Sequence, residues 1–289
     1  MRPSTDVRSS RSAQEPVLEV RDLTIAFGSN QRKAVDAISF DVAADERLGI
    51  IGQSGSGKSV TALAVMGLLP DHATVTGSIK FNGRELVGLP EREHRELRGD
   101  DIAMIFQEPM TALDPTMRVG RQIGEVVALH HRERRGGIRQ HVLTWLDRVG
   151  IADPERVSDS FPHELSGGQR QRALIAMALA NQPELVLCDE PTTALDVLVQ
   201  RQILALLAEQ LEGHSAIFVS HDLAVVKQVC QRVAVMLEGR IVEEGPIEQI
   251  IADPQHPYTQ GLIASARIDQ VPPGQKLPSV ADYYRAEQA

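Results

Sequence analysis

One stretch of eight residues constrains this chain more than any other, the run Gly-Gln-Ser-Gly-Ser-Gly-Lys-Ser at 52–59. It follows an apolar run at 48–51 that is typical of a buried strand, and it precedes a helix-forming run at 60–66. Such a turn lets backbone N–H groups and the N-terminus of a helix surround phosphate. Lys58 can then reach the terminal phosphates, and the hydroxyl of Ser59 can reach Mg²⁺. The stretch therefore predicts a phosphate-binding P-loop rather than an ordinary strand–loop–helix turn.

The composition excludes several classes of protein. The 289 residues are 42% hydrophobic, which is enough for one large core with a subdomain or for two small domains. A net charge of -9 and an aromatic content of 3% argue against a nucleic-acid partner. Cys188 and Cys230 lie in apolar segments and suit a reducing cytosol. No apolar run approaches the ~18 residues of a membrane span, so we expect a membrane role to depend on docking to another protein.

Strands alternate with helices along the chain, a pattern typical of an α/β fold with a mainly parallel sheet. Apolar and polar residues alternate at 18–20 and 38–42, and Asn82 with Gly83 forms a hairpin-turn pair after a run at 77–81. These segments predict a small antiparallel sheet beside the core. Other strands are expected at 102–106, 185–188, 216–219, 233–237 and 240–242, and helices within 119–161 and at 170–180 and 199–211.

Polar side chains follow three of the predicted core strands. An aspartate such as Asp189 at a strand end can hold Mg²⁺, and Glu190 beside it can polarise water. An isolated Asp-Glu pair is more often a solvated turn, but the P-loop favours the catalytic interpretation. His221 could reach a γ-phosphate, because strand ends are where an open α/β sheet binds its ligand, although a lone histidine is more often structural. Gln107 could orient water or contact Mg²⁺.

A second glycine-containing run, Leu-Ser-Gly-Gly-Gln at 165–169, precedes a helix rich in Ala, Leu and Ile. One interpretation is that Ser166 caps this helix. The other is a second anion site, in which Ser166 and the glycines at a helix N-terminus bind phosphate as the P-loop does. Because one nucleotide needs only one P-loop, a second phosphate site indicates a role on the nucleotide of another subunit.

These motifs, in this order over about residues 17–265, resemble the ATP-binding cassette of ABC transporters. The run at 165–169 resembles the signature motif, which is highly specific to that family. The other matches are the Walker A motif at 52–59, the Q-loop at Gln107, the Walker B motif at 185–190, the D-loop at 194–196 and the switch histidine at His221.

The resemblance implies a P-loop NTPase fold of the α/β class, with a mainly parallel core sheet, a flanking antiparallel β subdomain and an inserted helical subdomain. The ATPase domain is expected at 17–252, with the helical subdomain inserted at about 108–172. Residues 1–16 are rich in Ser and Arg without a signal-peptide core, and we expect a disordered lead-in there. Residues 253–289, rich in Pro and polar residues, are expected to form a C-terminal tail.

The same resemblance implies that ATP and Mg²⁺ are the cofactors. Phe27, at the start of a predicted loop, falls where the family carries an aromatic residue that stacks on adenine, and a core phenylalanine is the alternative. The expected catalytic residues are Glu190, which polarises the attacking water, His221 and Gln107, and the expected magnesium ligands are Ser59, Gln107 and Asp189. The expected nucleotide-binding residues are Phe27, Gly52, Gln53, Ser54, Gly55, Ser56, Gly57, Lys58, Ser59, Ser166, Gly167, Gly168, Gln169 and Asp196.

In this family two cassettes face each other head to tail, so Ser166 and Gly168 are expected to act on the ATP of the partner. The implied partners are a second ABC ATPase subunit, expected to be a related but different chain, transmembrane permease subunits and an extracytoplasmic solute-binding protein. No nucleic acid is expected. The implied location is the cytoplasmic face of the cell membrane, as a peripheral subunit.

Four further segments, at 105–115, 161–164, 191–196 and 256–259, resemble the dipeptide, oligopeptide and nickel importer ATPases. Peptides are therefore the expected cargo, and nickel or another small solute is the alternative. Many such subunits end in a cysteine-bearing segment that in some of them binds an iron–sulfur cluster. No cysteine follows Cys230, so we expect no iron–sulfur cluster.

Two other classes of protein carry a P-loop. Some ABC ATPases act in DNA repair or on ribosomes, but these generally contain two cassettes or a long coiled-coil insertion, whereas this acidic chain has one P-loop and one signature. A P-loop kinase or GTPase would leave the run at 165–169 without a role. The motifs therefore favour an ATPase subunit that energises solute import through a permease.

Overall fold

The computed structural model describes residues 15–28, 30–107, 112–130, 137–193, 195–266 and 280–284. Several predictions fall outside the described residues. These are most of the lead-in at 1–14, the segment 108–111 with which the helical insertion was expected to begin, Ala194 of the D-loop, and the parts of the tail at 267–279 and 285–289.

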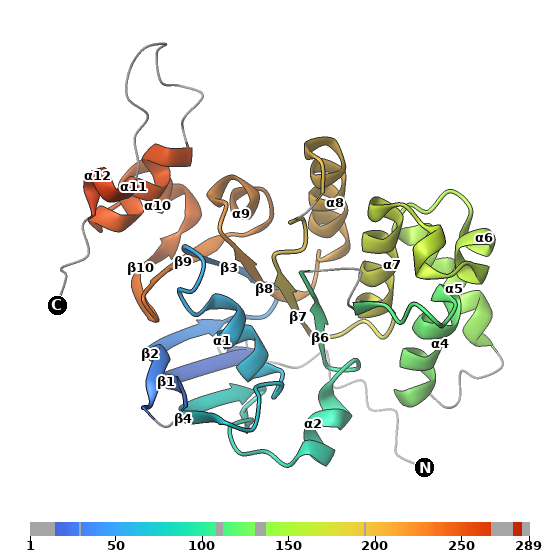
Figure 1. Cartoon of the computed structure of the whole chain (residues 1–289), viewed down its shortest axis with the longest axis horizontal. Helices are drawn as coiled ribbons and strands as arrows, with labels where there is room; N and C mark the ends of the chain where they lie inside the picture. The colour runs from blue at the N-terminus through green and yellow to red at the C-terminus, as the bar shows by residue number, and fades with distance from the viewer. Residues whose placement is uncertain are drawn as a thin grey trace, which may run out of the picture.

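Two sheets form the body of the molecule (Figure 1). A four-stranded antiparallel sheet has the order β2-β1-β4-β5, and a six-stranded sheet has the order β10-β9-β3-β8-β7-β6. The neighbours in the second sheet pair in parallel except for the hairpin of β9 and β10, so the expected mainly parallel core sheet is confirmed. The strands are β1 Leu18–Phe27, β2 Arg32–Val42, β3 Arg47–Ile51, β4 Ala73–Phe81, β5 Arg84–Glu85, β6 Ile102–Ile105, β7 Leu185–Asp189, β8 Ser215–Ser220, β9 Arg232–Leu237 and β10 Arg240–Pro246.

Helices fill the intervals between the core strands. Figure 1 shows α4, α5 and α6 grouped with α7 on one side of the six-stranded sheet, where the sequence predicted a helical insertion. The helices are α1 Lys58–Val65, α2 Glu91–Leu97, α4 Val119–His130, α5 Ile138–Arg148, α6 Pro154–Asp159, α7 Gly167–Leu179, α8 Val197–Gln210, α9 Leu223–Val229, α10 Ile247–Ala252, α11 Pro257–Ala266 and α12 Val280–Tyr283. No helix in these described ranges combines the length and the apolar character that a membrane crossing requires.

Two positions differ from the sequence expectations. Phe27 was expected to begin a loop, but it is the last residue of β1, paired with Arg32 of β2 and Ala73 of β4. The alternation of β1 simply continues to its aromatic end, so the turn begins one residue later. The segment expected to be a C-terminal tail contains the helices α11 and α12, and Tyr258 of α11 belongs to the main hydrophobic core.

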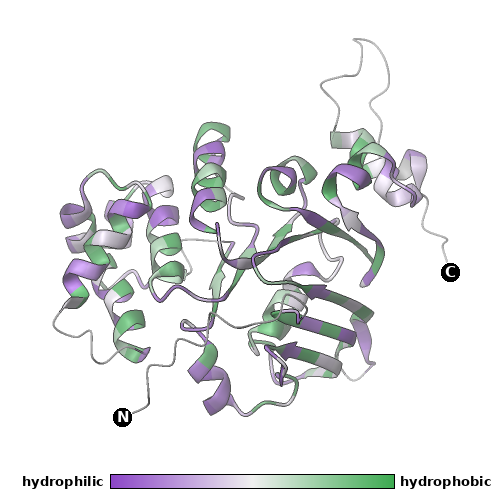
Figure 2. Ribbon diagram, turned by 180° about the vertical axis from the view of Figure 1, so that it is seen from behind, coloured by the Kyte–Doolittle hydropathy of each residue, from purple (hydrophilic) through white to green (hydrophobic). Residues whose placement is uncertain are grey.

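Two hydrophobic clusters lie on opposite faces of the six-stranded sheet. Successive side chains of a strand point to opposite faces. In β3, Ile50 therefore joins the cluster that contains α1 and the antiparallel sheet, whereas Ile51 joins the cluster that contains the inserted helices and α8. Leu187 and Cys188 of β7 divide in the same way. Figure 2 shows hydrophobic residues along these core strands and a mixture of polar and apolar residues in the antiparallel sheet.

The parallel register brings the C-terminal ends of three core strands to one edge of the sheet. Ile51 of β3 pairs with Ser220 of β8, and Asp189 of β7 pairs with Val219 of β8. The residues that follow these ends are the P-loop, Glu190 and His221. Residues separated by more than a hundred positions in the sequence therefore become neighbours.

Gly49 in the middle of β3 provides a test of this packing. An added β-carbon there would lie 2.1 Å from Cγ1 of Val226 on α9, inside van der Waals contact. Gly49→Ala is therefore expected to lower the free energy of unfolding by about 1–3 kcal/mol, measured by chemical denaturation. Gly137→Ala, where an added β-carbon meets open space, is the control. Wild-type stability of Gly49→Ala would contradict the packing of α9 on β3.

Candidate functional site

The P-loop connects the end of β3 to the start of α1. Gly57 caps α1 with φ of 103°, in the left-handed region that favours glycine. An added β-carbon at Gly57 would lie 2.6 Å from the carbonyl oxygen of Ala34 on β2. The loop therefore packs closely against the antiparallel sheet at its base, while Gln53, Ser54 and Gly55 remain exposed at its tip.

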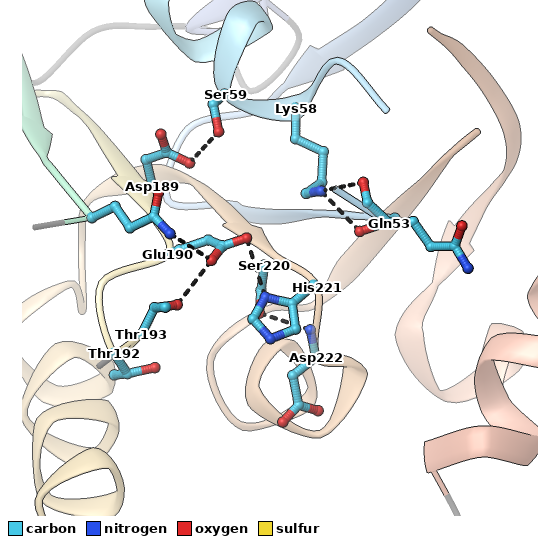
Figure 3. A network of polar contacts seen from close by, with 12 residues as sticks. Gln53, Lys58, Ser59, Asp189, Glu190, Thr192, Thr193, Ser220, His221 and Asp222 are labelled. Atoms are coloured by element: carbon cyan, nitrogen blue, oxygen red, sulfur yellow. Dashed lines mark hydrogen bonds and ion pairs between the residues drawn. The ribbon is translucent and has the colours of Figure 1, made fainter. Parts of the chain in front are cut away.

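Lys58 turns back into the loop. Its side-chain nitrogen Nζ donates hydrogen bonds to the carbonyl oxygens of Gly52 at 2.8 Å and Gln53 at 2.9 Å (Figure 3). The residue is 5% exposed, and burial lowers the pKa of its ammonium group against the attraction of Glu190 and Asp189. The positive charge therefore sits among backbone oxygens at the centre of the predicted phosphate nest, and phosphate oxygens would be stronger partners for it.

Ser59 at the start of α1 contacts Asp189 at the end of β7. The Ser59 hydroxyl donates to Oδ1 of Asp189 at 2.9 Å. Burial raises the pKa of Asp189, and the Ser59 hydrogen bond opposes that rise. Hydroxyl and carboxylate oxygens are ligands that suit Mg²⁺, which usually keeps several waters and takes few protein ligands. In the described ranges no group of three or more His, Cys, Asp or Glu side chains is placed to hold a metal.

Glu190 contacts other polar side chains of the site. Its backbone has φ of 44°, which is uncommon for a residue with a side chain. Its N–H donates a hydrogen bond to the carbonyl oxygen of Val219 at 3.0 Å. Oε2 accepts from Nε2 of Gln107 at 3.1 Å, and Nδ1 of His221 lies 3.1 Å from Oε1 (Figure 3). The structure therefore brings together the three residues that the sequence predicted to be catalytic.

The run at 165–169 lies apart from the P-loop of the same chain. It begins α7, which packs on α4, α5, α8 and β6, whereas α1 contacts β2, β7 and β8 (Figure 1). Ser166 accepts from the N–H of Gln169 at 3.3 Å, and Oε1 of Gln169 accepts from the N–H of Ser166 at 3.1 Å. The helix-capping interpretation of Ser166 is therefore confirmed. Ser166 and Gly167 remain exposed, so the same N-terminus is open to a ligand from outside.

The D-loop residue Asp196 lies beside this run. Its carboxylate caps α8, accepting from the N–H groups of Leu198 at 3.1 Å and Val199 at 3.0 Å. An added β-carbon at Gly168 would lie 3.1 Å from Cγ1 of Val199, so the start of α7 packs on the start of α8. The two predicted motifs thus form one surface.

Comparison with known proteins decides the family. The family model described as "ABC transporter" matches residues 35–193, more than half of the chain. This chain belongs to the ABC transporter family. A second model, "Oligopeptide/dipeptide transporter, C-terminal region", matches residues 242–282.

Several curated relatives are similar over most of the chain. A peptidoglycan transport ATP-binding protein of Agrobacterium fabrum is 51% identical over 87% of this chain, which spans 47% of that protein, about half of its length. A probable peptide ABC transporter ATP-binding protein of Sinorhizobium fredii is 51% identical over 86% of this chain and 76% of its own length. The oligopeptide transport ATP-binding protein OppD of Bacillus subtilis is 48% identical over 86% of this chain and 71% of its own length.

Solved cassettes have the same fold. A dimeric structure of the ABC transporter cassette MJ0796 matches with a TM-score of 0.71 and 28% identity, over 80% of this chain and 98% of that one. A post-hydrolysis dimer of the same cassette, bound to ADP and Pi, matches equally well. The expected α/β cassette fold is confirmed.

The cassette contains a polar residue that sequence reasoning missed. The hydroxyl of Thr193 donates to Oε2 of Glu190 at 2.9 Å, and a turn in which the Thr193 N–H bonds the Glu190 carbonyl at 3.1 Å brings it there. A cavity of about 240 Å³ opens beside these residues, with Ser220 and His221 also in its lining. A hydroxyl residue three positions after a strand-end carboxylate was the available signal.

Phe27 lies at the edge of the cassette's antiparallel sheet. Its ring is half-buried against the core cluster of that sheet, with its centroid 5.8 Å from that of the His72 ring. This packing supports the core interpretation of Phe27 in part, and adenine stacking stays a prediction.

Lys58 provides the direct test of the phosphate nest. Lys58→Ala removes the only side-chain cation of the P-loop run and should weaken ATP binding about tenfold or more, because charge-assisted bonds to phosphate are lost. A fluorescent-nucleotide titration measures this, with Lys80→Ala on the exposed face of β4 as the control. Wild-type affinity of Lys58→Ala would show that ATP does not bind at the P-loop.

Proposed function

We propose that this chain is the ATP-hydrolysing subunit that energises import of dipeptides or oligopeptides through a membrane permease. The observation that carries the ATPase part is the group of strand-end side chains around Glu190 beside the P-loop. The cargo part rests on the match of residues 242–282 to the oligopeptide/dipeptide C-terminal region and on relatives named for peptide transport. Nickel or another small solute is the alternative cargo, and a non-transport ABC ATPase is a more distant alternative.

Each polar group has a proposed role in hydrolysis. The phosphates of ATP are proposed to bind the Lys58 ammonium, whose orientation its carbonyl partners set. Ser59, Asp189 and Gln107 would hold Mg²⁺, which would neutralise phosphate charge. Glu190 polarises the water whose oxygen attacks the γ-phosphorus as the bond to ADP breaks. His221 donates toward the released phosphate. Most of the rate enhancement comes from positioning the reactants and from neutralising the charge on the phosphates, because phosphoryl transfer needs little covalent chemistry from the protein.

We infer that the working unit contains two cassettes. Ser166 and Gly168 lie at an exposed helix N-terminus away from the P-loop, so they are proposed to contact the ATP of the partner. Val197 and Leu198 next to the D-loop are each 68% exposed, an apolar pair that a facing subunit could cover. The partner is proposed to be a related but different chain.

The remaining subunits follow from the transport proposal. The helices α4–α6, within the proposed helical subdomain at 108–172, and the segment after Gln107 would transmit opening of the dimer to a permease. A solute-binding protein on the outer side would deliver the cargo. The chain would then sit as a peripheral subunit at the cytoplasmic face of the membrane, with its ATPase domain at 17–252.

Affinity capture of the chain from its native membrane in mild detergent, followed by mass spectrometry, tests the transport proposal. We expect a multi-span permease and a second, different cassette. The solute-binding protein associated with that permease can then be screened with peptides and with Ni²⁺. Recovery of ribosomal or DNA-repair proteins without a permease would contradict the transport proposal and leave the ATPase proposal intact.

Glu190→Gln tests the role of the carboxylate. The amide keeps the size of the side chain but polarises water poorly, so ATP should bind while turnover falls and the closed dimer accumulates. Gel filtration of the chain together with the second cassette, in ATP and Mg²⁺, measures the shift from monomer to dimer, and Glu212→Gln at an exposed turn is the control. Unchanged size together with unchanged turnover would refute this role.

A further inference from the structure

Tyr258 is a buried residue of α11 that the proposed hydrolysis does not use. It is 1% exposed, and its hydroxyl accepts a hydrogen bond from the backbone N–H of Gln53 at 2.9 Å. Gln53 belongs to the P-loop, 205 positions earlier in the sequence. A residue of the C-terminal region therefore contacts the backbone of the predicted phosphate nest directly.

The start of α11 is held firmly enough to position that hydroxyl. The carboxylate of Glu243 on β10 accepts from the N–H groups of Gln255 at 2.8 Å and His256 at 3.0 Å. Burial opposes ionisation of Glu243, but its hydrogen bonds prevail and hold its pKa below the usual value. The N–H of Tyr258 in turn donates to Nδ1 of His256 at 3.1 Å. The ring of Tyr284, 5.9 Å from that of Tyr258 between centroids, packs against it edge-on.

One peptide group connects Tyr258 with Lys58. The N–H of the peptide bond between Gly52 and Gln53 donates to Tyr258, and the carbonyl of the same peptide bond accepts from Nζ of Lys58 at 2.8 Å. A peptide group is planar, so fixing its N–H fixes the direction of its carbonyl. Hydrogen bonds at both ends of one amide also polarise each other. Tyr258, the peptide and Lys58 thus form a continuous chain of hydrogen bonds.

We propose that Tyr258 is a positioning residue for ATP binding, which acts from the C-terminal region by fixing the peptide that orients Lys58. The proposal rests on the proposed ATP site. Tyr258 acts through the loop and contacts no reacting atom. Burial also raises the pKa of its phenol, so the hydroxyl remains neutral and available as an acceptor near neutral pH.

The consequence for binding follows from preorganisation. Without the hydroxyl, the peptide rotates more freely, and ATP must order Lys58 as it binds. Loss of one such hydrogen bond should raise the dissociation constant for ATP about three- to tenfold. The turnover number should stay within about twofold, because the groups around Glu190 are unchanged.

Tyr258→Phe tests the proposal, because phenylalanine keeps the packed ring and removes only the hydroxyl. We expect the weaker ATP affinity in a fluorescent-nucleotide titration, a raised KM for ATP and a nearly unchanged kcat. Tyr283→Phe removes an exposed hydroxyl from α12 in the same region and should bind ATP as the wild type does. Wild-type affinity of Tyr258→Phe would overturn the proposal. Failure of the wild-type chain to bind ATP would instead overturn the proposed function.

A double-mutant cycle tests the route through Lys58. In the Lys58→Ala background, Tyr258→Phe should change ATP affinity little further, since the side chain that it positions is gone. An equal loss of affinity in both backgrounds would overturn the assignment, because it would show that Tyr258 acts on the fold of the loop as a whole.

Discussion

Parallel pairing of β3, β8 and β7 is the constraint on which the site depends. It places the P-loop, Glu190 and His221 at one edge of the sheet, although the sequence separates the first from the other two by more than a hundred residues. Glu190 then leaves its strand with φ of 44°, a conformation that the bond from its N–H to Val219 helps to hold. This turn directs the carboxylate toward Gln107, Thr193 and His221. A register shift of one residue would turn the hydrophobic side chains of a core strand to the opposite face of the sheet and displace the polar residue that follows its end.

Much of this arrangement was predictable because its signals are local. The P-loop run, the apolar strands and the polar residues directly after them carry the fold class and the residues around Glu190. The contact of Tyr258 with Gln53 was not predictable. It joins residues 205 positions apart, and its donor is a backbone N–H, which does not depend on the type of residue at position 53. Thr193 was missed for a different reason: its hydroxyl reaches Glu190 only because of a turn whose geometry the sequence does not show. The predicted start of the loop at Phe27 was one residue too early, because a strand that ends in an aromatic residue and a loop that begins with one have the same sequence pattern.

The P-loop and the signature run of the cassette lie on separate elements. Its P-loop and its signature run both present helix N-termini, but on different elements, and the exposed Ser166 has its own capping partner within α7. The C-terminal region adds a further contact, because Tyr258 of α11 accepts a hydrogen bond from the backbone of the P-loop at Gln53. The proposed nucleotide site and the C-terminal region therefore meet at the P-loop.

We propose that an ATP site requires the signature of a second cassette. The most direct measurement is the rate of phosphate release per chain over a wide range of protein concentration, with this chain alone and with the second cassette that accompanies it. We expect the rate per chain to fall on dilution and to rise when the second cassette is added, because the proposed complete site exists only in the dimer. A rate per chain that is independent of concentration and of the second cassette would contradict it.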